Sequence, residues 1–68
     1  MRTFSLFTTD SRYSVPTLTL VIAEDERQAI ERAEANLRES SFHRAVELRD
    51  DARPVYRRSR AEERSPLN

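Results

Sequence analysis

The order of polar and apolar residues in the first part of the chain has a period of two, which is typical of β-strands. The first strand is predicted over residues 2–9, where aromatic, leucine and threonine side chains alternate between two faces. The second is predicted over residues 14–23, and one of its faces carries Leu18, Leu20 and Ile22. Pro16 cannot donate a backbone hydrogen bond, so it belongs at the start of that strand or on a sheet edge. Because the turn-forming segment Asp10-Ser11-Arg12 separates the two strands, we expect an antiparallel hairpin.

At residue 24 the periodicity changes to that of an amphipathic helix. Apolar residues recur at spacings of one, three and four, at Ala29, Ile30, Ala33 and Leu37. Asp25 is suited to cap the helix, and Gln28 stands three residues later, as in a capping box. We predict a helix over residues 25–39 that ends at Ser40-Ser41, since the chain has no glycine for a left-handed cap.

Strand periodicity returns over residues 42–49, with Val46 and Leu48 on the face expected to meet the helix. A turn at Asp50-Asp51 follows, since aspartate tolerates left-handed geometry better than most residues. A short edge strand is predicted over residues 54–58. The fold class is therefore α+β, a small antiparallel sheet of three or four strands (ββαβ or ββαββ) with one helix packed on one face. Residues 1–60 form one domain, and residues 61–68 are expected to be a disordered tail.

The side chains between helix and sheet form a small predicted core. Its members are Phe4, Leu6, Leu18, Leu20, Ile22, Ala29, Ile30, Ala33, Leu37, Val46 and Leu48. The opposite face of the sheet is expected to be mildly apolar, and a second copy of the chain could cover it. This candidate self-association face consists of Phe7, Thr17, Thr19, Val21 and Ala45. The alternative is a threonine-rich face in contact with water, since threonine favours strands for conformational reasons.

Composition excludes most catalytic and cofactor sites. The chain has no cysteine and no glycine, which removes thiolate metal sites, cysteine nucleophiles and glycine-rich phosphate loops. The single histidine, His43, is interpreted as a partly exposed strand residue without a catalytic partner set. Asp50-Asp51 and Glu62-Glu63 are interpreted as turn and tail residues. We therefore expect that the protein is not an enzyme and that it has no cofactor, no metal site and no small-molecule substrate.

The charges balance, with twelve basic and twelve acidic residues, but they are unevenly distributed. Residues 24–39 carry six acidic residues against three arginines, whereas the segment 53–60 carries only positive charge. Arginine binds phosphate oxygens and tyrosine stacks on unpaired bases. The segment is therefore a candidate contact for nucleic acid or an acidic partner through Arg53, Tyr56, Arg57, Arg58 and Arg60. The alternative is an arginine-rich edge strand that resists aggregation.

Every basic residue is arginine, which either reflects function or a GC-rich genome. The longest apolar run is Leu20-Val21-Ile22-Ala23, far short of the ~20 residues of a membrane-spanning helix. The first residues also lack the continuous apolar centre of a signal peptide. A cytoplasmic location without membrane contact is therefore expected.

An acidic-capped, alanine-rich helix is followed by Ala45-Val46-Glu47-Leu48-Arg49-Asp50 and Arg53-Pro54-Val55-Tyr56-Arg57. Over residues 2–58 this order resembles a loose group of very short, uncharacterised alphaproteobacterial proteins. In that group a tryptophan and a glycine often stand where this chain has Arg49 and Asp51. The resemblance implies a ββαβ(β) fold and a bacterial origin, but it implies no activity and no site residues.

These observations predict a small, non-enzymatic protein-interaction or regulatory module that self-associates. The alternative is a nucleic-acid-binding accessory protein that uses the arginine-rich segment.

Overall fold

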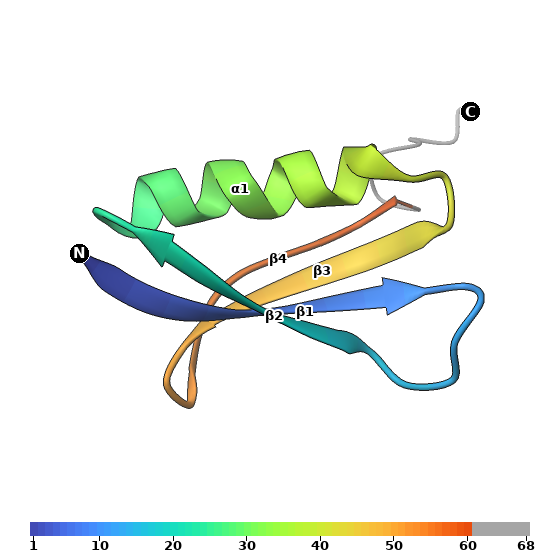
Figure 1. Ribbon diagram of the computed structural model, residues 1–68, viewed down its shortest axis with the longest axis horizontal. Helices are drawn as coiled ribbons and strands as arrows, with labels where there is room; N and C mark the ends of the chain where they lie inside the picture. Colours follow the sequence, from blue (N-terminus) through green and yellow to red (C-terminus); the bar gives the residue numbers. More distant parts are fainter. Residues whose placement is uncertain (61–68) are drawn as a thin grey trace.

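Within the residues that the structure describes, the chain forms one antiparallel sheet with one helix lying across one of its faces (Figure 1). The computed structural model describes residues 1–60, and the predicted tail lies outside them. The elements are β1 (Arg2–Asp10), β2 (Thr17–Ala23), α1 (Glu26–Glu39), β3 (His43–Asp50) and β4 (Arg53–Ser59). The predicted α+β class is confirmed in its ββαββ form.

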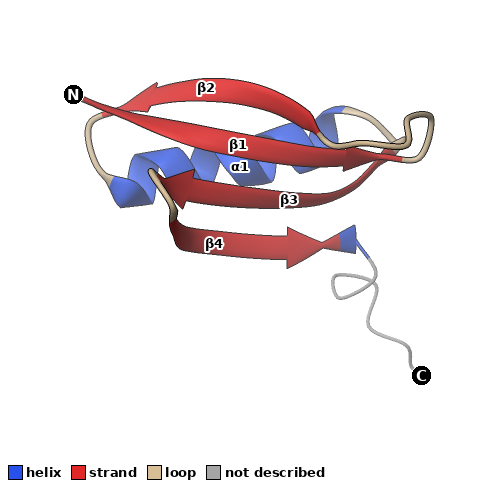
Figure 2. Cartoon of the chain, turned by 90° about the horizontal axis from the view of Figure 1, so that it is seen from below, coloured by secondary structure: helices blue, strands red, loops and turns tan. Residues whose placement is uncertain are grey.

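The strands lie in the order β2-β1-β3-β4, and each neighbouring pair is antiparallel (Figure 2). After β2 the chain crosses the sheet as α1 and returns as β3 on the other side of β1. The two central strands are therefore β1 and β3, and β2 and β4 are the edges. The fourth strand is present and extends over seven residues rather than the predicted five.

The helix begins as its sequence predicts. The Asp25 carboxylate accepts a hydrogen bond of 2.9 Å from the backbone amide of Gln28. The Gln28 side chain in turn accepts one of 2.9 Å from the amide of Glu24. Two amides at the start of the helix thus gain partners, as a capping box requires, although the second bond reaches Glu24 instead of Asp25.

The end of the helix is capped by a residue that follows β4. Arg60 donates hydrogen bonds to the backbone carbonyl oxygens of Leu37 and Ser40, the latter at 2.9 Å. A guanidinium at this position satisfies carbonyls that have no partner within the helix, and its charge suits the negative end of the helix dipole. A cap of this kind replaces the glycine that the chain lacks.

The core lies between α1 and the sheet. Its buried apolar side chains among the described residues are Phe4, Leu6, Val21, Ala23, Ala29, Ala33, Leu37, Val46 and Leu48. Ile30 is half-buried and packs against this cluster. The predicted core is thus confirmed for β1, α1 and β3.

The predicted orientation of the second strand is wrong. Val21 is opposite the buried Phe4 in the β1–β2 register, and paired residues of adjacent strands point to the same face. Val21 therefore faces the helix, and Leu18, Leu20 and Ile22 are exposed on the other face. A shift of one residue in the register turns every side chain of a strand to the opposite face of the sheet. Because the connection at residues 11–16 is long, the sequence does not fix the register between β1 and β2.

The turn between β3 and β4 contains a residue in left-handed geometry. Asp50 pairs with Arg53 across this turn, and the intervening Asp51 has a φ of 56°. Aspartate visits this region at lower cost than most residues, which confirms the interpretation of Asp50-Asp51 as a turn.

Candidate functional site

The arginine-rich segment is turned largely toward the helix. Arg53 donates a hydrogen bond of 2.6 Å to the Glu26 carboxylate, which raises the pKa of Arg53. Tyr56 donates one of 2.8 Å to Glu34, and Arg58 contacts the same carboxylate oxygen at 3.3 Å. The acidic face of α1 and the basic segment therefore neutralise one another within the fold.

The two remaining candidate arginines of this segment lie in different surroundings. Arg57 is opposite Glu47 in the β3–β4 register, on the face away from the helix. Arg60 caps α1 and also donates to the backbone carbonyl of His43 at 2.8 Å. Burial is the main cause of the raised pKa of Tyr56. Contact with nucleic acid stays a prediction, but less positive charge is available for it than the sequence alone indicates.

The face of the sheet away from the helix carries an apolar row along β2. Side chains of Leu18, Leu20 and Ile22 are exposed by 56%, 65% and 58%. Phe7, opposite Leu18, belongs to this face, and the Arg49 guanidinium lies 5.1 Å from the centre of its ring.

The candidate self-association face must be corrected for this geometry. Phe7 and Ala45 lie on the uncovered face, since both belong to its row in the β1–β3 register. Thr17, Thr19 and Val21 lie on the helix side. The uncovered face is therefore more apolar than predicted, because leucine and isoleucine replace threonine and valine along β2.

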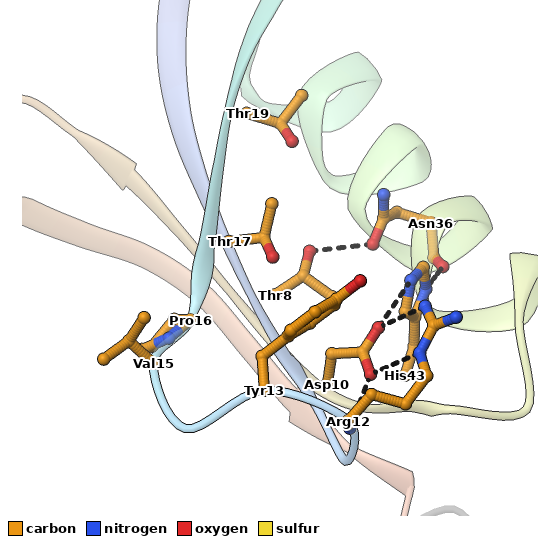
Figure 3. Close-up of a pocket in the computed structure, with 10 residues that line it drawn as sticks. All are labelled: Thr8, Asp10, Arg12, Tyr13, Val15, Pro16, Thr17, Thr19, Asn36 and His43. Atoms are coloured by element: carbon orange, nitrogen blue, oxygen red, sulfur yellow. Dashed lines mark hydrogen bonds and ion pairs between the residues drawn. The ribbon is translucent and has the colours of Figure 1, made fainter.

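A pocket of about 500 Å³ lies between the β1–β2 connection, the start of β2 and the second half of α1 (Figure 3). Its apolar wall includes Tyr13, Val15 and Pro16. Its polar residues are Thr8, Asp10, Arg12, Thr17, Thr19, Asn36 and His43. The pocket thus brings seven polar residues from β1, β2, β3, α1 and the β1–β2 connection to one space.

An ion pair between the buried Asp10 and the partly exposed Arg12 lines this pocket. Asp10 is only 4% exposed. Its carboxylate accepts hydrogen bonds from Arg12 Nε at 3.0 Å, Arg12 Nη2 at 2.8 Å and the Arg12 backbone amide at 2.8 Å. The side-chain bonds from Arg12 outweigh the effect of burial and lower the pKa of Asp10 from 3.8 to about 2.

Two aromatic rings hold the guanidinium of Arg12. It lies 4.4 Å from the ring centre of Phe42 and 5.4 Å from that of Tyr13. Cations favour the faces of aromatic rings at such distances. Arg12 is therefore held in place by its acid partner and by both rings.

His43 lies beside this pair and not beside an acid of its own strand. Its Nδ1 is 2.6 Å from the backbone oxygen of Asn36, and its Nε2 is 3.8 Å from Asp10. The side chain is 16% exposed, so it is more buried than the sequence indicates. Glu47, an acid of the same strand, accepts a hydrogen bond of 2.9 Å from Arg49 Nε instead.

Sequence reasoning missed the pocket because its residues are far apart in the chain. Asp10 and His43 meet through the β1–β3 pairing, where a bulge between Thr9 and Asp10 shifts the register. The only local indication of the pocket in the sequence is the segment Asp10-Ser11-Arg12, which predicts a turn. The acid does cap that turn, through the Arg12 amide, but it also places the charged pair at the pocket.

Comparison of the chain with protein-family models, with curated proteins and with solved structures gives no match. No three histidine, aspartate or glutamate residues within residues 1–60 are grouped closely enough to hold a metal ion. No helix in this part of the chain has the length and apolar character needed to cross a membrane.

Proposed function

We propose that this protein is a non-enzymatic protein-interaction or regulatory module of the bacterial cytoplasm, and that it self-associates through β2. The observation that carries the proposal is the exposed apolar row Leu18, Leu20 and Ile22 on an edge strand. Three large apolar side chains, each more than half exposed at alternate residues of one strand, are typical of a protein–protein interaction surface.

The outer edge of β2 lacks the features that prevent strand pairing. Residues 17–23 contain no charged residue and no proline, and no strand among residues 1–60 pairs with that edge. Natural sheets usually protect an exposed edge with charges, prolines or bulges. The opposite edge has such protection, since β4 contains Pro54 and three arginines. The contrast supports pairing at β2 and not at β4.

The sequence of β2 is suited to pairing with itself. In an antiparallel pair of two copies centred on Leu20, Leu18 of one copy stands opposite Ile22 of the other. The apolar side chains then form one continuous row on the uncovered face, and Thr19 stands opposite Val21 on the helix side. Because the formal charge of the chain is zero, two copies do not repel one another through net charge.

Sedimentation velocity over a range of concentrations tests the proposal. We expect a monomer–dimer equilibrium for the wild type, and Leu20→Glu should shift it strongly toward monomer because two carboxylates would meet at the centre of the pair. Ala52→Glu adds the same charge at an exposed turn beside the opposite edge and should leave the equilibrium unchanged. Circular dichroism should show both variants folded. A wild type that stays monomeric at millimolar concentration, or an equilibrium unaffected by Leu20→Glu, would contradict the proposal.

A further inference from the structure

The pocket beside Asp10 has the size of a small-ligand site. Its volume of about 500 Å³ lies within the ~300–1,000 Å³ of typical ligand pockets. It opens between β2 and the second half of α1, so a ligand can enter without any rearrangement of the sheet (Figure 3). A second hollow, of about 390 Å³, continues along β2 and shares Thr19 and Asn36 with the first.

The charges around the pocket favour a neutral ligand. One carboxylate, Asp10, and one guanidinium, Arg12, line the pocket together with the imidazole of His43. Asp10 and Arg12 are joined to each other by two side-chain hydrogen bonds. An anion would have to compete with Asp10 for the guanidinium, and a cation would have to compete with Arg12 for the carboxylate. Neither exchange brings a net gain in paired charge, because the pair is already formed and its two charges cancel; Asp10 is buried, and the Arg12 side chain is 47% exposed.

The hydrogen-bonding groups favour a ligand with several hydroxyl groups. Figure 3 shows the hydroxyls of Tyr13, Thr17 and Thr19 directed into the space between β2 and α1. The Thr8 hydroxyl donates to Asn36 Oδ1 at 2.8 Å, which fixes the amide and leaves its nitrogen as a donor. A protein hydroxyl both donates and accepts, as a hydroxyl of a ligand does, so the two match in several orientations. Three hydrogen bonds from Arg12 also leave the Asp10 carboxylate some capacity to accept another.

The apolar wall completes the match to one class of compound. The hydroxyl groups share the pocket with an apolar wall, which consists of the Tyr13 ring, Val15 and Pro16. Carbohydrates combine hydroxyl groups at the ring edge with an apolar C–H face that packs on an aromatic ring. We propose that this pocket binds a neutral carbohydrate of one or two sugar units. The proposal does not depend on self-association through β2.

Titration of the ¹⁵N-labelled protein, followed by heteronuclear NMR, tests this site. The probes are D-glucose, N-acetyl-D-glucosamine and maltose, each to 50 mM, at a protein concentration below that of any self-association. We expect saturable shifts with at least one sugar, concentrated at the amides of Thr17 and Thr19 and at the side-chain amide of Asn36. Sodium phosphate at matched ionic strength and adenosine serve as the anionic and aromatic comparisons.

Two variants and one matched control separate a site from general effects. Thr19→Ala and Tyr13→Ala should each weaken sugar binding at least five-fold, and both positions are exposed enough that the fold is retained. Thr3→Ala removes the same hydroxyl from an exposed position on the other face of the sheet and should leave the affinity unchanged. The proposal is overturned if no sugar reaches saturation, if neither variant weakens binding, or if phosphate or adenosine binds more tightly than every sugar.

Discussion

Asp10 shows how a single residue links local structure to stability. Its carboxylate caps the turn that follows β1 and holds Arg12, while nearly all of its surface is removed from water. Such a buried charge is tolerated only because its hydrogen bonds compensate for the lost hydration. The residue is therefore structural whether or not a ligand occupies the pocket.

The lowered pKa of Asp10 predicts a specific dependence of stability on pH. A carboxyl with a pKa of 3.8 when unfolded and about 2 when folded stabilises the fold fully above pH 3.8. That contribution is lost as the pH falls through 2. We expect a clear difference in the free energy of unfolding between wild type and Asp10→Asn at pH 5. It should shrink progressively below pH 4. Thermal or urea unfolding at several pH values measures it, and a constant difference down to pH 2 would contradict the role assigned to Asp10.

Asp51 is a second residue whose backbone geometry has a measurable cost. With a φ of 56° it occupies a region that glycine adopts freely. Asp51→Gly should therefore stabilise the protein by about 0.5 kcal/mol, the relief of strain being partly offset by the greater freedom of glycine in the unfolded chain. Asp51→Val should destabilise it by about 1 kcal/mol or more, since a β-branched residue is a poor fit to left-handed geometry. Urea denaturation of the three proteins gives both values, and equal midpoints for all three would refute the assignment.

At the scale of the elements, the two faces of the hairpin can be told apart by one pair of substitutions. Leu6 and Leu20 lie on adjacent strands, yet Leu6 is 1% exposed and Leu20 is 65% exposed. Leu6→Ala should cost about 2–5 kcal/mol through lost burial and a cavity. Leu20→Ala should change the free energy of unfolding by less than about 0.5 kcal/mol when the protein is dilute. Chemical denaturation at low concentration measures both, and similar costs for the two variants would restore the orientation predicted from the sequence.

The attachment of β4 to α1 predicts an effect of one helix carboxylate. Glu34 accepts from both Tyr56 and Arg58, across contacts that are only partly exposed. Glu34→Gln should lower the free energy of unfolding by about 0.5–1 kcal/mol, because partial exposure screens the charge but leaves the hydrogen bonds. Glu31→Gln is the matched control, since Glu31 lies on the same helix and its pair with Arg27 is exposed and 3.8 Å long. Equal effects of the two substitutions in a thermal melt would show that Glu34 does not hold β4.

Most of the helix and strand assignments follow from the sequence alone, for physical reasons that can be named. The helix was predictable because its apolar stripe, its Asp25 cap and the acids around its start all agree. The strands were predictable because their period of two is clear. The orientation of β2 was not, because both of its faces contain apolar residues, and the row with larger side chains is the exposed one. The pocket was also hidden, since Asp10 and His43 lie far apart in the chain and meet only through the sheet register.

At the scale of the whole molecule, the small core connects stability to association. A chain of 68 residues buries roughly 60% of its unfolded surface, so its stability as a monomer is marginal. Any partner that binds only the folded form stabilises it by mass action. We expect the proposed pair at β2 to bury part of the exposed apolar row and so to add to this stability.

Association through β2 therefore predicts that thermal stability depends on protein concentration. The melting temperature of the wild type should rise as its concentration increases from the micromolar to the millimolar range. The melting temperature of Leu20→Glu should not rise in this way. Calorimetry at several concentrations of each protein provides the comparison. A wild-type melting temperature independent of concentration would mean that association contributes nothing to the fold.

The unequal edges of the sheet also set a limit on how far copies can add to one another. A pair joined at β2 has consumed both open edges, and its outer strands are then the two β4 strands, with proline and arginine side chains. In the proposed pair, a third copy would find no open β2 edge, so growth by strand pairing should stop at an eight-stranded sheet instead of continuing into a fibril. In the proposed pair, the unprotected edge strand β2 permits pairing, and the protected edge strand β4 prevents the addition of further strands.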